Sequence, residues 1–572
     1  MSALRSLASF TALLGNRALA VLRGDSAAQL GFETVEYLRD RLLPDLQNTV
    51  RYAAYRRRRR QLISAARAAA GPPGGPLISV LMPVHDPRPE HLRAALDSVS
   101  GQIYPDWELC LVDDGSQRQE ARDLLQEAAS DSRVHLRRLD PGRGIAGASQ
   151  AALEMAGGEL VAMLDHDDVL EPDALLEMAQ AAAANPEADL LYSDEDRLGP
   201  MGVGLLPYFK PDWSPDLLLS NMYLGHLLVL RRSLALEVGG FRAGFDGSQD
   251  HDLALRVSER ARQVVHLPEV LYRWRAARGS TSLRYREKPE AADASRRAIT
   301  EALQRRGEAG AEVSQSNYPG FFQVHWPLPG GIRISAALCD CPGETACRRT
   351  VAALKRSTGL PPISVLCLQP EPGCRNLPVL PGVGTRERAR ALAAIDADVV
   401  LLLRGGIEPE PDAPALLAAQ VLRRGIGAAG GLVRERDGRV VHAGLAQGDD
   451  GRLRPLYAGR DPGPKGYFGL LLCAREVDAL GPELWASRRD RFEAALDDLD
   501  SESAPIALAQ SLGARLAASG ERLLLEPRAA ATASTKAGPR IFGSPGSPAQ
   551  SACHYPRGLR TDPPDFLIRL AR

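Results

Sequence analysis

The sequence has few cysteines, few lysines and no long apolar run, and each shortage excludes a class of protein. Eight cysteines are spread over 572 residues without a CxxC pair, which argues against a zinc ribbon and against a secreted disulfide framework. No stretch approaches the roughly 18 apolar residues that span a bilayer. Arg5, Arg17 and Arg23 interrupt the apolar N-terminal stretch, which is not the pattern of a signal peptide. We therefore expect an unexported, cytoplasmic protein with reduced thiols.

The charges nearly cancel, with 70 Lys and Arg against 71 Asp and Glu. Only five of the cations are lysines, a bias that we attribute to coding rather than to function. A chain without a basic field is not expected to bind nucleic acid. Residues 56–60, all arginine, are a local exception. They are either the solvated end of a helix or a peripheral contact with the inner face of the cytoplasmic membrane, where each cation contributes about 1 kcal/mol.

The length argues for two to four domains, at roughly 150 residues each. Apolar residues at helical spacing predict a helical N-terminal region, which the Gly-Pro-Pro-Gly-Gly sequence at 71–75 ends. The last residues are rich in Gly, Pro and Ser without periodicity, so we expect a flexible tail. The predicted segments are a helical region 1–75, a catalytic domain 76–300, a linker 301–330, a second domain 331–535 and a tail 536–572.

From residue 77 onward, short apolar runs alternate with helical patterns, at 78–82, 92–99, 107–112, 160–164 and 174–184. This rhythm predicts an α/β fold with a mostly parallel, Rossmann-like sheet that binds ligands at the carboxyl ends of its strands. Asp113 and Asp114 follow one strand, and Asp165, Asp167 and Asp168 follow another. Converging carboxylates repel one another unless a cation lies between them.

Mg²⁺ or Mn²⁺, with a substrate diphosphate, is the cation that such oxygen ligands favour. Turn and helix-cap roles explain either acidic cluster taken alone. The two clusters together favour the metal.

An ordered set of motifs then resembles glycosyltransferase family 2 over residues 77–300. The residues that carry the resemblance are Pro83-Val84-His85-Asp86, Val112-Asp113-Asp114-Gly115-Ser116, Asp165-His166-Asp167-Asp168, Gly239-Gly240-Phe241 and Gln249-Asp250-His251-Asp252-Leu253. The resemblance implies a GT-A fold and the inverting transfer of a sugar from a nucleotide-sugar donor. Residues 192–196 and 209–216 look like a subgroup that builds bacterial surface polysaccharide, including O-antigen rhamnosyltransferases.

The resemblance also implies roles for individual residues. It places the following in the nucleotide-sugar site: Pro83, His85, Asp113, Asp114, Asp165 and Arg273. Asp113 and Asp114 would meet the base and the ribose. It assigns the divalent metal to Asp165 and Asp167, with Asp168 as an alternative ligand.

Two positions depart from the family pattern. The acidic pair before the acceptor helix is usually Glu-Asp, whereas Gln249-Asp250 stands here, so we expect Asp250 to be the catalytic base that accepts the acceptor's proton. Asp252 is the fallback, and its other role is to cap a helix that starts near Leu253. Arg273 stands where a histidine is frequent, so a metal contact is not expected there, and the guanidinium is suited to hold a diphosphate.

The second half repeats part of the first without its carboxylates. Residues 160–168 align without gaps with residues 399–407, and the register continues from 171–174 into 410–413. Arg404 stands at the position of Asp165. We therefore expect a degenerate second GT-A-like domain, in which His442 is either structural or functional.

The function that these features favour is a metal-dependent, inverting glycosyltransferase. It would move a sugar to a glycan or lipid-linked oligosaccharide acceptor in the biosynthesis of cell-surface polysaccharide. The alternative is a non-catalytic scaffold that binds glycan or partners in a polysaccharide-assembly complex, as the degenerate half suggests. A dinucleotide oxidoreductase is disfavoured, because no GxGxxG follows the first strand.

Overall fold

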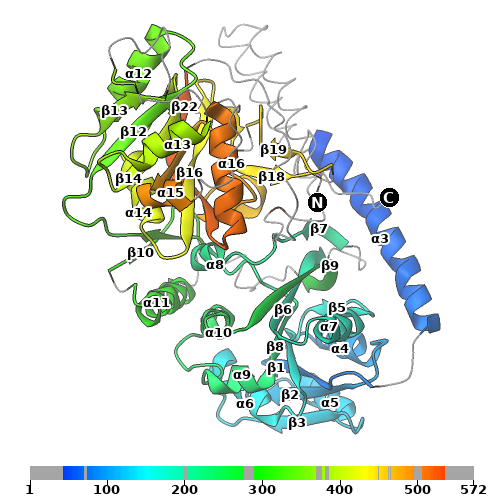
Figure 1. Ribbon diagram of the computed structural model, residues 1–572. Coiled ribbons are helices and arrows are strands. Elements are labelled where there is room, and N and C mark those ends of the chain that lie inside the picture. The colour runs from blue at the N-terminus through cyan, green and yellow to red at the C-terminus, as the bar shows by residue number, and fades with distance from the viewer. Residues whose placement is uncertain are drawn as a thin grey trace, which may run out of the picture.

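The computed structural model describes residues 43–69, 74–198, 204–275, 289–308, 310–368, 377–379, 385–448, 450–461, 463, 465–494, 505–534, 555 and 559. Figure 1 shows two α/β halves that pack against each other, with a long helix, α3 (Leu43–Ala69), along the outer side of the first. Residues 1–42 of the helical region predicted over 1–75 lie outside the described residues. In the predicted tail only Tyr555 and Leu559 are described, and both are buried. No helix in the described part of the chain is both long and apolar enough to cross a membrane.

The first half is built on a nine-stranded sheet in the order β3-β2-β1-β4-β8-β6-β9-β5, with β7 paired to β6. β1, β2, β3 and β4 are parallel, whereas β8 runs antiparallel to both β4 and β6. The strands are β1 (Ile78–Val84), β2 (Trp107–Asp113), β3 (Val134–Arg138), β4 (Leu160–Met163), β5 (Val169–Leu170), β6 (Ala188–Leu198), β7 (Gly204–Tyr208), β8 (Leu228–Arg231) and β9 (Gln263–Arg275).

Helices cover both faces of this sheet, which explains why its central strands are apolar on both sides. They are α4 (Pro89–Ser100), α5 (Gln119–Ala128), α6 (Gly144–Met155), α7 (Ala174–Ala184), α8 (Pro215–Ser220), α9 (Arg232–Glu237), α10 (Gln249–Ser258) and α11 (Pro289–Arg305). The predicted α/β fold is confirmed, and the helix predicted over 174–184 has the bounds of α7. One prediction is wrong: α10 begins at Gln249 rather than near Leu253, so Asp252 lies inside the helix and does not cap it.

The second half contains a sheet in the order β13-β12-β14-β21-β16-β22-β15. This matches β2-β1-β4-β8-β6-β9-β5 strand for strand, including the antiparallel strand (β21 or β8) between two others. The strands are β12 (Ile334–Cys339), β13 (Ser364–Cys367), β14 (Val399–Arg404), β15 (Ile407–Pro409), β16 (Ile426–Glu435), β17 (Val440–His442), β18 (Leu445–Gln447), β19 (Leu453–Pro455), β20 (Arg475–Glu476), β21 (Leu484–Arg488) and β22 (Arg522–Ala533). Its helices are α12 (Glu344–Leu354), α13 (Thr385–Ala393), α14 (Ala413–Val421), α15 (Arg489–Ala494) and α16 (Pro505–Ala518).

Helix starts and backbone hydrogen bonds in the first half recur in the second half at the positions that the sequence alignment pairs. α7 begins at Ala174 and α14 at Ala413, which are aligned positions. The carbonyl oxygen of Pro172 accepts a hydrogen bond of 2.8 Å from a loop N–H, and the oxygen of the aligned Pro411 does the same at 2.8 Å. These matches support the predicted division into two related domains.

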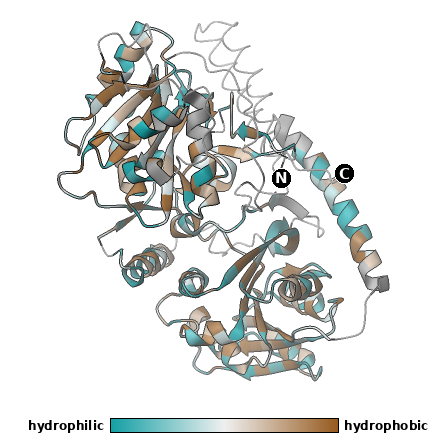
Figure 2. Ribbon diagram, viewed as in Figure 1, coloured by the Kyte–Doolittle hydropathy of each residue, from teal (hydrophilic) through white to brown (hydrophobic). Residues whose placement is uncertain are grey.

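The two halves meet at a buried cluster of charges around α8. The carboxylate of Asp216 binds Arg423 at 2.6 Å and Arg522 at 2.5 Å, and Arg522 also reaches Glu476 at 2.7 Å. Apolar side chains surround this cluster, and Figure 2 shows the hydrophobic strands at the centre of each half. Buried ion pairs fix relative geometry, because a displaced partner would leave a charge without solvent. The halves therefore have a defined orientation.

The segment 301–330, predicted as a linker, contains more structure than that prediction allowed. It holds the end of α11 and a hairpin of β10 (Glu312–Gln315) and β11 (Phe322–His325). Asn221 of the first half donates a hydrogen bond of 2.7 Å to the carbonyl oxygen of Gly320. The segment is therefore packed against the first half.

The five arginines at 56–60 divide between the two faces of α3. Arg56 binds Glu171 at 2.7 Å and Arg59 binds Asp173 at 2.8 Å, and both arginines are buried. Arg57, like the other two, is exposed. The two buried arginines thus hold the helix to the first half, a role that neither the solvated nor the lipid-binding alternative included.

Replacing Arg59 with Ala should destabilise this contact by about 3 kcal/mol, because it leaves the Asp173 carboxylate buried without its partner. Arg57→Ala, on the exposed face, should change stability by less than about 0.5 kcal/mol. Urea denaturation and limited proteolysis of α3 measure the two effects. Equal stability of the two variants would show that the ion pair does not hold the helix.

Candidate functional site

A cavity of about 650 Å³ opens at the carboxyl ends of β1 and β4. The end of β1, the loop after β4, the end of β6, the start of α10 and residues 319–322 and 468 contribute to its lining. Four of the residues predicted for the site meet there: Pro83, Asp165, Asp167 and Asp250. The parallel strands β1 and β4 and the helix α10 thus deliver groups that lie far apart in the sequence to one space.

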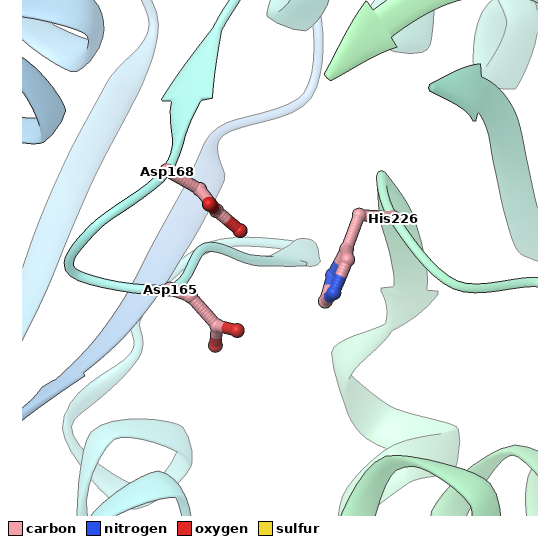
Figure 3. Close-up of side chains that lie close together, drawn as sticks. All are labelled: Asp165, Asp168 and His226. Atoms are coloured by element: carbon pink, nitrogen blue, oxygen red, sulfur yellow. The ribbon is translucent and has the colours of Figure 1, made fainter. Parts of the chain in front are cut away.

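Three side chains at the cavity are arranged as metal ligands: Asp165 and His226 line it, and Asp168 is buried beside them. One ligand atom each of Asp165, Asp168 and His226 lies within 4.8 Å of the other two, and Figure 3 shows the two carboxylates and the imidazole facing a common space. Carboxylate oxygens suit Mg²⁺ and Mn²⁺, and an imidazole is compatible with Mn²⁺. The donor set therefore fits a divalent cation.

The surroundings of Asp168 disfavour its charged form unless a cation is bound nearby. It accepts hydrogen bonds of 2.6 Å from the Tyr272 hydroxyl and 2.6 Å from the Arg275 backbone N–H. Burial, together with the carboxylates of Asp165 and Asp167, raises the pKa of Asp168 well above its usual range. A bound cation would remove this penalty, because it favours the charged form.

The cluster differs from the predicted ligand pair in one member. Asp165 belongs to it, and so does Asp168, the predicted alternative. Asp167 lines the cavity but is not part of the cluster. The assignment of Asp167 as a ligand stays a prediction.

His226 is a candidate ligand that the sequence did not reveal, because an isolated histidine within an apolar run belongs to no motif. Its ring stacks on Tyr272 with centroids 4.5 Å apart. Its backbone N–H donates to Glu195 at 2.8 Å, and its carbonyl oxygen accepts from the Lys210 ammonium at 2.6 Å. Lys210 also donates to the carbonyl oxygen of Leu224 at 2.6 Å, so one buried cation fixes the loop that presents His226.

The two aspartates of α10 have different surroundings. Asp250 lines the cavity, and its carboxylate accepts one hydrogen bond of 2.8 Å, from the backbone of His251. Asp252 is fully buried and accepts from Arg242 at 3.1 Å and from Arg256 at 3.1 Å. Asp250 is therefore placed to meet a ligand, and Asp252 holds the helix in position.

Three of the residues predicted to contact the nucleotide are at the ends of β1 and β2 but do not line the cavity. Asp113 accepts from the backbone N–H of Ser116 at 2.9 Å, and Asp114 accepts from that of Gly144 at 2.9 Å, where α6 begins. The ring of His85 lies 2.8 Å from the carbonyl oxygen of Asp114. These bonds shape the turns at the edge of the cavity.

Arg273 also lies outside the residues that line the cavity. Its Nε atom is 3.2 Å from Glu171 and 3.3 Å from Asp196, so the guanidinium is held between two carboxylates. Arg197, which lines the cavity, stacks its guanidinium over Trp274 at 4.8 Å from the ring centroid. No motif in the sequence distinguished Arg197.

At the aligned place in the second half, an arginine replaces the carboxylate motif. Arg404 donates from Nε to Asp340 at 2.6 Å. His442 is buried in the hairpin of β16 and β17, 3.1 Å from Glu483. This burial favours the structural alternative for His442.

A buried histidine supports the loops behind the cavity. The two ring nitrogens of His266 lie 2.9 Å from Asp194 and 2.9 Å from Asp212, and the ring stacks on Tyr192. Burial alone would lower the pKa of His266, but the two carboxylates outweigh it and raise the pKa above its usual value. The protonated form therefore stabilises the fold.

The sign of the resulting pH dependence follows from this raised pKa. The contribution of His266 should be fully present below about pH 6.5, its unfolded pKa, and should be lost as the pH rises through the folded pKa. Urea denaturation from about pH 6 to about pH 9 should show this loss in the native protein and a smaller one in His266→Gln. The same slope in both proteins would exclude His266 as its source.

Comparison with known proteins finds a family for part of the chain. Residues 79–233 match the model of Glycosyl transferase family 2. The uncharacterized protein y4gI of Sinorhizobium fredii is 34% identical over 445 residues, which are 73% of this chain and 49% of that protein. The O-antigen biosynthesis protein RfbC of Myxococcus xanthus is 33% identical over 475 residues, 78% of this chain and 36% of that protein. A solved mannosyltransferase of Pyrobaculum calidifontis covers 46% of this chain and 81% of its own, at 19% identity and a TM-score of 0.32.

The chain thus carries a glycosyltransferase family 2 domain, as the motifs predicted. It spans about half or less of the length of the two curated relatives.

Proposed function

We propose that this chain is a metal-dependent, inverting glycosyltransferase that moves a sugar from a nucleotide-sugar donor to a glycan or lipid-linked acceptor. The observation that carries the proposal is that Asp165 and His226, two members of the cluster with Asp168, line the same cavity of a family 2 domain as the carboxylate of Asp250. A metal-binding group and a free carboxylate are the two parts that such a displacement needs.

In this mechanism each group has one task. A divalent cation, when bound by Asp165, Asp168 and His226, supplies the charge that stabilises the leaving nucleoside diphosphate. Asp250 accepts the proton of the acceptor hydroxyl as its oxygen attacks the anomeric carbon. The attack displaces the diphosphate directly, through an oxocarbenium-like transition state, and so inverts the configuration without a covalent enzyme intermediate.

The remaining residues position the donor. We assign Asp113, Asp114 and His85, at the ends of β1 and β2, to the region of the base and ribose. Arg197, rather than Arg273, is the guanidinium that lines the cavity, and it is suited to a phosphate group. Arg273 keeps Glu171 and Asp196 in place.

The similarity to an O-antigen biosynthesis protein over 78% of this chain supports a role in cell-surface polysaccharide biosynthesis. We place the protein in the cytoplasm, where nucleotide sugars are made, with a peripheral contact to the membrane that holds a lipid-linked acceptor. The alternative, a non-catalytic scaffold, is supported by the loss of the carboxylates in the second half. It leaves the placement of Asp250 in the cavity without a purpose.

The metal requirement is tested with Asp165→Ala. UDP-, GDP- and dTDP-sugars are screened for release of nucleoside diphosphate with and without Mn²⁺, and calorimetry measures binding of Mn²⁺ alone. We expect the variant to lose both activity and Mn²⁺ binding by at least about tenfold while its thermal unfolding stays unchanged, because Asp165 is partly exposed and binds an ion rather than filling the core. Full activity after exhaustive chelation would contradict the proposal.

The base is tested with Asp250→Asn, which keeps the shape of the side chain and removes its basicity. Transfer should fall by about two to four orders of magnitude, while the affinity for nucleoside diphosphate with Mn²⁺ stays near normal. Asp252→Asn is the matched change on the same helix, and it should lower stability instead, by about 3 kcal/mol, because it weakens a buried ion-pair network. An active Asp250→Asn together with a folded but inactive Asp252→Asn would reverse the assignment.

A further inference from the structure

The second half contributes to the cavity although it has no carboxylate motif of its own. The short 3-10 turn Tyr467–Gly469 reaches over the first half, and Phe468 lines the same cavity as Asp165 and Asp250. Nothing in the mechanism above uses this side chain.

Phe468 is a large apolar side chain held at the surface. Its ring stacks on Tyr208, at the end of β7, with centroids 4.2 Å apart and planes 13° apart, and 39% of the residue remains exposed. Tyr208 covers one face of the ring and Tyr467 packs against it with centroids 4.9 Å apart, so the exposed area is the part of the ring that these two residues leave open. An exposed aromatic face inside a cavity is available to a ligand.

The turn that carries this ring is fixed to both halves. The backbone N–H of Phe209 donates to the Tyr467 hydroxyl at 3.1 Å, and the N–H of Tyr467 donates to the Tyr457 hydroxyl at 2.8 Å. At Gly469, a Cβ atom would lie 2.2 Å from the ring of Phe321, so only glycine fits there. The position of Phe468 is therefore set by the fold.

The backbone of Phe468 is also strained. Its φ of 45° and ψ of 29° lie in the left-handed region, which is unfavourable for a residue with a Cβ atom. Glycine would adopt this conformation freely. Strained backbone conformations cluster at ligand-binding sites, so the strain at Phe468 is consistent with a function of its side chain.

We propose that Phe468, backed by Tyr208, is a stacking platform for a sugar ring of the acceptor glycan. A pyranose presents C–H groups on its face and hydroxyls at its rim, so its face packs on an aromatic ring while its rim stays free for hydrogen bonds. In the proposed function the charged donor binds near Asp165 and His226. Phe468, Phe321 and Met222 give another part of the cavity an apolar lining. This inference rests on the proposed function, and it gives the second half the role of completing the acceptor site.

The platform is tested with an array of purified bacterial O-polysaccharides and capsular polysaccharides. Phe468→Ala removes the ring and keeps the backbone constraint, Phe468→Tyr keeps the ring, and Leu236→Ala removes a side chain of similar exposure, 37%, that does not line the cavity. We expect Phe468→Ala to weaken glycan binding at least about tenfold, and the other two variants to bind as the native protein does.

Calorimetry with UDP, GDP or dTDP and Mn²⁺ separates this inference from the proposed function. All three variants should bind nucleoside diphosphate like the native protein. Normal glycan binding by Phe468→Ala, or no glycan binding by the native protein, would overturn the platform. Glycan binding that depends on Phe468, in a protein that binds no nucleoside diphosphate, would support the platform and overturn the enzyme.

Discussion

The candidate site depends on a buried ammonium group, that of Lys210. It is fully buried and donates to Glu195 at 3.2 Å and to backbone oxygens on three sides, among them that of His226. Burial lowers its pKa, while the carboxylate of Glu195 works in the opposite direction. If Lys210 were absent, Glu195 would keep only the backbone N–H of His226, three buried carbonyl groups would lose their donor, and the loop that presents His226 would be held less firmly. Tyr208, which supports Phe468, lies two residues before Lys210, so the metal-binding wall and the aromatic wall share one support.

The second half has kept its strand order while losing the chemistry, and the interface explains why it is still needed. Asp216 binds arginines from the second half at 2.5 and 2.6 Å, and the cavity ends at Phe468. A family 2 domain without the second half would have an open cavity and an uncompensated buried carboxylate.

Strands and helices with a periodic apolar pattern could be predicted from the sequence. The roles of side chains whose partners are distant in the sequence could not. The strands β1, β2 and β4 and the helix α7 follow from apolar runs and helical spacing, and the alignment of 160–168 with 399–407 revealed the second domain. His226 was missed because an isolated histidine in an apolar stretch has no local signal, and its role depends on a loop after β4. The burial of Arg56 and Arg59 was missed for the same reason, since their partners are more than 100 residues away.

The aligned positions Asp165 and Arg404 carry opposite charges at the same place in the two sheets. In the first half, Asp165 and Asp168 bring two carboxylates close together, and burial with the neighbouring carboxylates raises the pKa of Asp168. In the second half, Arg404 brings its own positive charge and pairs with Asp340 at 2.6 Å. The guanidinium is paired within the protein, and a cation at this position does not attract a metal. The half that carries an unbalanced charge is the one that retains the capacity to bind, which is why we place the chemistry in the first half.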